Sequence, residues 1–167
     1  MLLSDMEIKK LQESSPPLIQ DAPDFSMQVQ SNGFDLTVKE VSSFEGNGTI
    51  DFSNHERAIP ETKVLVFKND FVFLERGAYK IKSNEIVHLP NDLVALAQSR
   101  SSLLRMGAFT AHGVWDAGFN GRSEFLLVVE NPSGIKVKRN ARVAQMIFVK
   151  LDEEVGKPYQ GVYRDLK

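Results

Sequence analysis

Three short segments of this 167-residue sequence carry side chains that could act on a phosphorylated substrate. The first, residues 98–105, is rich in hydroxyl and guanidinium groups: Arg100, Ser101, Ser102 and Arg105. Hydroxyls and arginines at the start of a helix form a set of hydrogen-bond donors suited to phosphate. The same pattern is also typical of a capped surface helix whose arginines are solvated.

The second segment, residues 110–121, predicts a β-hairpin, because the turn signals Ala-Gly and Asn-Gly lie between apolar residues. Asp116 stands where the first strand enters the turn. A carboxylate there can take a proton from water if Trp115 and Phe119 partly desolvate it. The alternative is an aspartate that only hydrogen-bonds to the backbone of its own turn.

The third segment, residues 138–147, is a basic turn that leads into an apolar strand interrupted by Gln145. If both faces of that strand are buried, the Gln145 amide needs hydrogen-bond partners. Those partners can belong to a ligand or to the protein core, and the sequence does not choose between them.

The elements that must position these segments are mostly short β-strands. Alternating or apolar runs predict strands over 34–38, 63–67, 71–74, 78–82, 93–98, 125–129, 135–138 and 143–151. Many short strands separated by turn signals favour an all-β barrel or sandwich. A short internal helix is predicted over 101–106, ended by Gly107. Another is predicted at the N-terminus, where Ser4 and Glu7 form a capping box, whereas residues 18–32 are expected to be irregular.

The overall composition excludes several classes of protein. With 42% hydrophobic and 25% charged residues and a net charge of −2, the chain has the balance of a globular domain without a nucleic-acid partner. The absence of cysteine excludes disulfides and thiolate metal sites, and the three histidines match no zinc signature. No apolar run approaches the roughly 20 residues of a membrane span, and the N-terminus lacks a signal peptide's apolar core. We therefore expect a cytoplasmic protein without a membrane partner.

Taken together, four segments resemble the family that unites trimeric dUTPases with dCTP deaminases, in chain order between residues 31 and 163. The segments are 31–36 (Ser-Asn-Gly-Phe-Asp-Leu), 100–105, 113–121 and 142–146. The resemblance implies a mainly β fold: a distorted, jelly-roll-like β-barrel of the dUTPase type with a short N-terminal helix and one short internal helix. It also implies a single domain over 1–167, with an N-terminal helical segment at 1–17 and a flexible C-terminal tail at 157–167.

For activity, the resemblance implies Mg²⁺-dependent hydrolysis of dUTP to dUMP and pyrophosphate by a homotrimer with shared active sites. The catalytic residues would be Asp116, which deprotonates the attacking water, and Arg105, which lies near the base and the water. The phosphates would be bound by Arg100, Ser101, Ser102, Gln145 and Arg164. The nucleoside would be bound by the hairpin residues Gly113, Val114 and Phe119.

The metal is expected to be held mainly by the triphosphate and water, without a direct protein ligand. Asp35 would contribute only indirectly, through the metal's water shell or at a subunit junction. Two further positions are less well defined by the resemblance. His112 is expected to be structural or exposed, and closure of the tail over the triphosphate by Arg164 is a hypothesis.

A dCTP deaminase, alone or combined with dUTPase activity, is the nearest alternative. That enzyme needs a glutamate ten residues after the hairpin aspartate, where this chain has Leu126, or Val128 after allowance for a two-residue extension. Glu124 and Glu130 lie close by, so a different register would restore the deaminase. The segment around 121–132 looks instead like archaeal dUTPases, which favours dUTP hydrolysis. A non-catalytic nucleotide-binding module is the second alternative.

Overall fold

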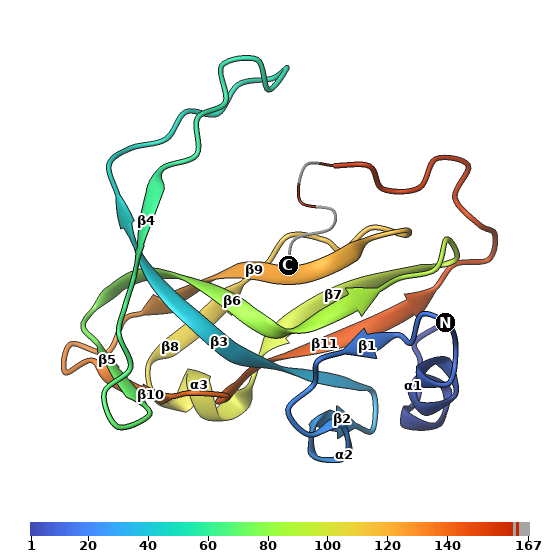
Figure 1. Cartoon of the computed structure of the whole chain (residues 1–167), viewed down its shortest axis with the longest axis horizontal. Helices are drawn as coiled ribbons and strands as arrows, with labels where there is room; N and C mark the ends of the chain where they lie inside the picture. The colour runs from blue at the N-terminus through green and yellow to red at the C-terminus, as the bar shows by residue number, and fades with distance from the viewer. Residues whose placement is uncertain (162, 164–167) are drawn as a thin grey trace.

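A strongly curved, nearly closed β-sheet dominates the computed structural model, which describes residues 1–161 and 163 (Figure 1). Its main strands run in the order β7-β11-β3-β6-β9-β8, and the short strands β1, β2 and β4 pair at its margins. The bounds are β1 Ile19–Gln20, β2 Val29–Gln30, β3 Gly33–Glu45, β4 Glu61–Val64, β6 Gly77–His88, β7 Leu93–Ser99, β8 Ala108–Ala111, β9 Asn120–Val129 and β11 Arg142–Lys150. A separate two-stranded sheet pairs β5 (Phe71–Leu74) with β10 (Ile135–Lys138).

The predicted mainly β, barrel-like fold is confirmed, and each of the eight predicted strands overlaps an observed one. Several boundaries were wrong: the strand predicted over 78–82 runs on to His88, and the strand predicted over 125–129 begins at Asn120. The strand predicted over 34–38 continues to Glu45, because a register shift between Val38 and Glu40 lets β3 leave β11 and pair with β6. The strand predicted over 63–67 ends at Val64, where pairing with β3 stops.

Alternation along the strands explains where the core lies. In β9 the odd-numbered side chains Phe125, Leu127 and Val129 are buried, while the even-numbered ones remain partly exposed. A side-chain period of two is what a strand with one buried face requires. Burial of each such side chain stabilises the fold by about 1.5–3 kcal/mol. The even-numbered face of β9 is therefore free to line a binding site.

Within the described residues, three short helices flank the sheet. The N-terminal helix α1 (Asp5–Gln12) has the predicted reciprocal Ser4–Glu7 capping box and buries Ile8. The predicted internal helix is α3 (Ser101–Arg105), and Gly107 follows it in the left-handed region at φ +75°. The short helix α2 (Phe25–Gln28), in the segment expected to be irregular, was missed because its four residues carry no periodic pattern.

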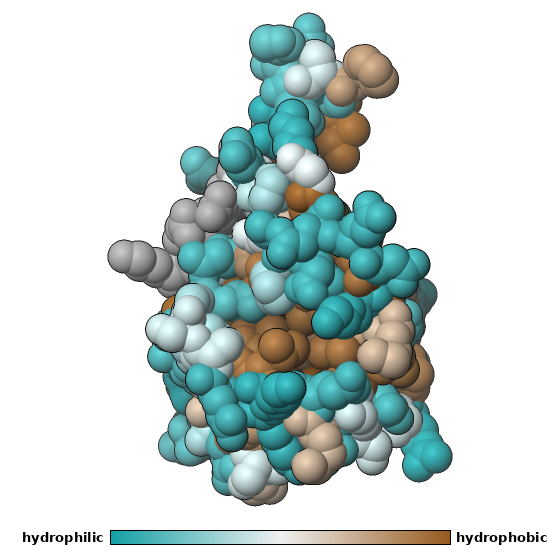
Figure 2. All heavy atoms as spheres, turned by 90° about the vertical axis from the view of Figure 1, so that its right-hand side faces the viewer, coloured by the Kyte–Doolittle hydropathy of each residue, from teal (hydrophilic) through white to brown (hydrophobic). Residues whose placement is uncertain are grey.

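A long arm, residues 46–60 between β3 and β4, stands away from the sheet (Figure 1). Paired hydrogen bonds between Thr49 and Ala58 order the arm internally. Phe52 and Ile50 are almost fully exposed on it, and Figure 2 shows the arm rising above the body with hydrophobic residues along one side. Across the described parts of the chain, every helix is too short or too polar to span a bilayer.

Candidate active site

Strand pairing brings three of the four predicted motifs together. Gln145 on β11 lies opposite Asp35 on β3 and, across its other edge, opposite Gln98 on β7. The start of α3 follows β7 directly, so Arg100 reaches the same place. A side chain on Gly33 would put its Cβ 2.3 Å from the Met146 carbonyl oxygen, so glycine permits the close approach of β3 and β11 that sets this register.

Asp35 is the centre of this cluster. Its buried carboxylate forms ion pairs with Arg100 (Nε–Oδ2 3.2 Å) and Arg142 (Nη1–Oδ2 3.3 Å). Arg142 also donates to the Met27 carbonyl oxygen at 2.7 Å. The arginine side chains remain 28% and 31% exposed, so the carboxylate fixes both guanidinium groups while each can still meet an anion from solvent.

The electrostatics of Asp35 reflect two opposed effects. Burial raises the pKa of the Asp35 carboxyl, and the guanidinium groups of Arg100 and Arg142 oppose that rise. The second carboxylate oxygen, Oδ1, is buried and has no hydrogen-bond partner among the described residues. Asp35 therefore faces the arginines and is not turned toward open solvent.

Hydroxyl groups border the cluster at the beginning of α3. Ser101 and Ser102 are exposed, and in the part of the chain that the structure describes no side chain caps the start of this helix. Arg105 is exposed at the other end of the same helix. Arg100, the N-cap residue, donates its backbone N–H to the Val143 carbonyl oxygen at 3.1 Å, which ties the helix start to β11. Arg100 thus contacts Asp35, and Ser101 and Ser102, which follow it directly in the chain, are accessible to solvent.

The predicted hairpin lies between β8 and β9. Trp115 pairs with Ala95 of β7 through two backbone hydrogen bonds and donates its indole N–H to Ser123 Oγ at 2.9 Å. The chain then turns over residues 116–119, where the Phe119 N–H donates to the Asp116 carbonyl oxygen at 3.0 Å. Gly118 takes φ +84° in this turn. Asp116 enters the turn as predicted, but its side chain is exposed, and the bulk of Trp115 and Phe119 lies in the interior.

Within one chain, Asp116 and the α3 hydroxyls belong to different regions. Trp115 lies opposite Ala95 on β7, whereas Arg100 follows Ser99 at that strand's far end. Ser99 lies four positions after Ala95 along the strand, which corresponds to about 13 Å. Figure 1 likewise shows the loop from β8 to β9 well apart from α3. One copy of the chain does not bring the aspartate to the serines.

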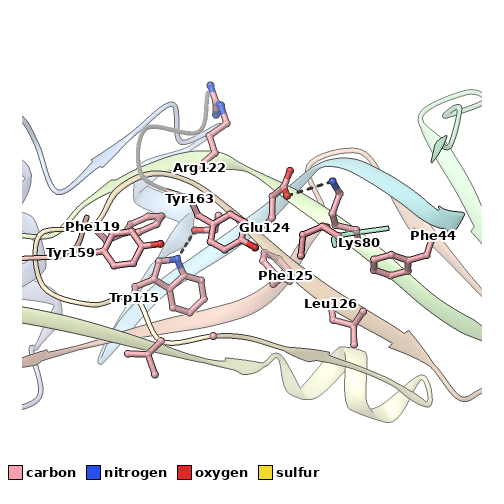
Figure 3. Close-up of a pocket in the computed structure, with 14 residues that line it drawn as sticks. Phe44, Lys80, Trp115, Phe119, Arg122, Glu124, Phe125, Leu126, Tyr159 and Tyr163 are labelled. Atoms are coloured by element: carbon pink, nitrogen blue, oxygen red, sulfur yellow. Dashed lines mark hydrogen bonds and ion pairs between the residues drawn. The ribbon is translucent and has the colours of Figure 1, made fainter. Parts of the chain in front are cut away.

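The hairpin instead borders a cavity of about 370 Å³ (Figure 3). Three of its lining residues are the predicted nucleoside-binding residues Gly113, Val114 and Phe119. Leu126 lines it from β9, Phe44 lines it from the end of β3, and Ile59 lines it from the arm. The volume lies within the range of small-ligand pockets, and the apolar lining suits a nucleoside.

Several of these lining residues were missed by sequence reasoning. Lys80, Phe44, Ile59 and Tyr159 come from four separate parts of the chain, so no local motif connects them. Tyr159 packs on Phe119 with ring centroids 5.8 Å apart, and its backbone N–H donates to the Ala117 carbonyl oxygen at 2.9 Å. The beginning of the predicted tail thus lies against the hairpin, while Arg164 falls outside the described residues.

His112 also lies near the cavity, although the cavity is not lined by it. Its ring packs against Phe125 and Trp115, with centroid distances of 4.8 Å and 5.6 Å. Burial lowers the pKa of His112 to about 4, and Nε2 has no hydrogen-bond partner among the described residues. The imidazole is therefore neutral near pH 7.

Comparison with known proteins defines the class. A model of the dCTP deaminase-like family matches residues 2–151, and the chain belongs to that family. It is 48% identical to a probable deoxyuridine 5'-triphosphate nucleotidohydrolase of Methanosarcina mazei, over 98% of this chain and 96% of the relative. It is 39% identical to the deoxyuridine 5'-triphosphate nucleotidohydrolase of Methanocaldococcus jannaschii, over 82% and 87% of the two chains.

A solved structure supports the same fold. The 2'-deoxycytidine 5'-triphosphate deaminase of Agrobacterium tumefaciens superposes with a TM-score of 0.64 at 25% sequence identity. The similarity covers 88% of this chain and 47% of that one, so this chain spans about half the length of that deaminase. The family thus includes two activities on pyrimidine deoxynucleoside triphosphates, and the residues of the site must distinguish them.

Proposed function

We propose that this protein hydrolyses dUTP to dUMP and pyrophosphate. The observation that carries the proposal is the cluster of Arg100 and Arg142 around Asp35, beside the exposed hydroxyls of Ser101 and Ser102. Such a cluster can neutralise a triphosphate in a chain of net charge −2. The names of the archaeal relatives, at up to 48% identity over nearly the whole chain, support the same activity.

The residues of the cluster take phosphate-binding roles in this proposal. Ser101, Ser102 and Arg100 bind phosphate oxygens, and Gln145 contacts the phosphates from β11. Arg105 lies near the base and the attacking water, and Arg164 reaches the phosphates from the tail. Hairpin backbone groups at Gly113 and Val114 hold the nucleobase. Phe119 packs against the 2' carbon of the sugar and excludes ribose.

Asp116 is the proposed general base. Its carboxylate accepts a proton from the water, whose oxygen forms a bond to the α-phosphorus. The bond from the α-phosphorus to the oxygen bridging to the β-phosphorus breaks, and pyrophosphate leaves with that electron pair. Positioning the water and neutralising charge are the main contributions that this reaction needs from a protein.

Mg²⁺ is the proposed cofactor, and it would neutralise charge on the bound triphosphate. The described residues contain no cluster of three or more His, Cys, Asp or Glu side chains that could hold a cation by themselves. Asp35 is engaged by two arginines and is buried. This donor set fits a metal that arrives with the phosphates, with Asp35 acting only indirectly.

The proposed assembly is a homotrimer with shared sites, and the separation of Asp116 from Ser101 and Ser102 within one chain supports the sharing. Each complete site would combine the hairpin of one copy with the α3 cluster of another. Mixing two inactive variants tests this arrangement: Asp116→Asn in one chain and Ser101→Ala with Ser102→Ala in the other. If each site uses two chains, random assembly leaves about a quarter of the sites intact.

The mixture is refolded together and assayed for pyrophosphate release from dUTP with Mg²⁺. We expect activity near a quarter of the wild type, while the two variants assayed separately stay inactive. Mixtures as inactive as the single variants would contradict shared sites. Light scattering on the wild type gives the number of chains, and an active monomer would contradict the trimer.

Assays with dCTP separate the proposal from its alternative. The deaminase position is occupied by Leu126, or by Val128 in the shifted register, and both are apolar. Glu124 is paired with Lys80, and Glu130 forms an exposed ion pair with Arg76. We expect pyrophosphate from dUTP and no ammonia from dCTP. Ammonia release would indicate a deaminase or a bifunctional enzyme, and binding of dUTP without turnover would indicate a nucleotide-binding module.

A further inference from the structure

One ion pair interrupts the largely apolar wall of the cavity beside the hairpin. Lys80 on β6 and Glu124 on β9 both line it, and Lys80 Nζ lies 3.4 Å from Glu124 Oε2. Their side chains are 26% and 30% exposed, so the pair is partly covered and still accessible from the cavity. Figure 3 shows the pair beside Phe125 and Phe44. A few polar groups in a largely apolar wall are what fixes the orientation of a ligand in a pocket of this kind.

The pairing of β6 with β9 places this ion pair next to Leu126. Lys80 is the direct cross-strand partner of Leu126, the position at which a deaminase would carry its glutamate. Glu124 lies two residues before Leu126, on the same face of β9. A deaminase replaces the amino group at C4 of the pyrimidine, so its proton-transferring glutamate must lie near C4. Under the proposed function, the Lys80 ammonium would therefore lie next to the 4-substituent.

The second cationic side chain that lines the cavity, Arg122, is bound to groups outside it. Arg122 donates from its two terminal nitrogens to the Asn84 carbonyl oxygen and to Asp21. Lys80 instead has one ion-pair partner among the described residues, Glu124. An ammonium carries three N–H donors, so Lys80 can keep Glu124 and still donate to a ligand.

We propose that Lys80, held in place by Glu124, donates a hydrogen bond to the 4-oxo group of uracil and thereby discriminates against cytosine. The inference rests on the proposed function, which puts the nucleoside in this cavity. Uracil offers an acceptor at position 4, whereas cytosine offers an amino donor. An amino group facing the ammonium would leave two donors opposed in a partly desolvated site, which disfavours cytosine. Lys80 is then a specificity residue and Glu124 a positioning residue.

The test compares kcat/KM for three substrates in Lys80→Met, with Lys136→Met as the control. Lys136 is an exposed lysine on β10 that does not line this cavity. We expect Lys80→Met to lower kcat/KM for dUTP about tenfold or more, since a hydrogen bond to a charged group is lost. We also expect the preference for dUTP over dCTP to fall by a similar factor. This preference is the ratio of the two kcat/KM values or, if dCTP is not turned over, the ratio of KM for dUTP to the inhibition constant of dCTP. The ratio of dUTP to dTTP, which shares the 4-oxo group, stays within about twofold.

Two further variants separate recognition from folding. Lys80→Arg keeps a donor and should restore most of the dUTP preference, while Glu124→Gln should weaken it less than Lys80→Met does. Calorimetric binding of dUMP and dCMP gives a readout that does not need turnover. An unchanged preference in Lys80→Met overturns the inference, even if the wild type is an active dUTPase. A wild type that fails to hydrolyse dUTP overturns the proposed function, whereas a dUMP preference that depends on Lys80 would still support the inference.

Discussion

The α3 cluster and the hairpin region differ in how complete each is within one chain. Around Asp35, three strands and one helix converge, and two arginines are already held by a buried carboxylate. In the hairpin region, the backbone is fixed by Trp115 and the turn at Gly118, but the Asp116 side chain is exposed. In the first region two arginines are held in place before any ligand binds, whereas the carboxylate of the second region is exposed.

This difference fits two separate roles in the proposed site: phosphate binding by the α3 cluster and proton transfer by the hairpin carboxylate. A binding surface for a highly charged triphosphate benefits from arginines fixed in advance, because less side-chain freedom is then lost on binding. A general base, in contrast, needs to contact the attacking water only when the substrate is bound. Changes in the α3 cluster should therefore reduce stability, and changes at the hairpin carboxylate should reduce turnover without reducing stability.

The largest expected effect is on turnover. Asp116→Asn removes the proposed proton acceptor but keeps the size and the exposed position of the side chain. We expect kcat to fall at least about 100-fold while nucleotide binding and unfolding in urea change little. Steady-state kinetics measure kcat, calorimetric titration with dUTP measures nucleotide binding, and urea denaturation measures stability. Asp152→Asn, at an exposed position after β11, is the control, and near-normal turnover in Asp116→Asn would remove this residue as the base.

The opposite pattern is expected for Asp35. Asp35→Asn leaves the guanidinium groups of Arg100 and Arg142 without their carboxylate in a partly buried place. We expect the free energy of unfolding in urea to fall by about 2–3 kcal/mol. Glu130→Gln, which breaks the exposed pair with Arg76, should change it by no more than about 0.5 kcal/mol. Equal effects in the two variants would show that the buried cluster contributes no more than a surface ion pair.

Sequence reasoning predicted the α3 cluster better than the cavity. The phosphate-type residues lie in short contiguous segments, so Arg100, Ser101 and Ser102 were visible as one pattern. Their meeting with Asp35 and Gln145 depends on the β3–β11–β7 register, which no local pattern in the sequence predicts and which strand pairing now describes. The helix end at Gly107 was predictable because glycine commonly takes the left-handed conformation there.

The cavity could not be predicted because its residues are remote in sequence and belong to ordinary strand patterns. Lys80 lies in a run that reads simply as an amphipathic strand, and its neighbour Leu126 follows 46 positions later. The exposed arm at residues 46–60 could not be predicted from the sequence for a different reason. Its apolar residues Ile50 and Phe52 suggest a strand or core segment, yet both are exposed because the arm stands away from the sheet.

The smallest expected effect concerns His112, the buried histidine of the hairpin region. Folding lowers the pKa of His112 to about 4 from 6.5, so between these values the unfolded chain binds more protons. The stability that depends on neutral His112 is therefore complete above pH 6.5 and is lost as the pH falls toward 4. We expect the free energy of unfolding to decrease by about 1–2 kcal/mol between pH 7 and pH 5 from this group. In His112→Leu this part of the decrease should be absent, whereas His55→Leu, on the arm, should keep it. Parallel pH profiles for wild type and His112→Leu would show that the imidazole is not the group that makes the hairpin region acid-sensitive.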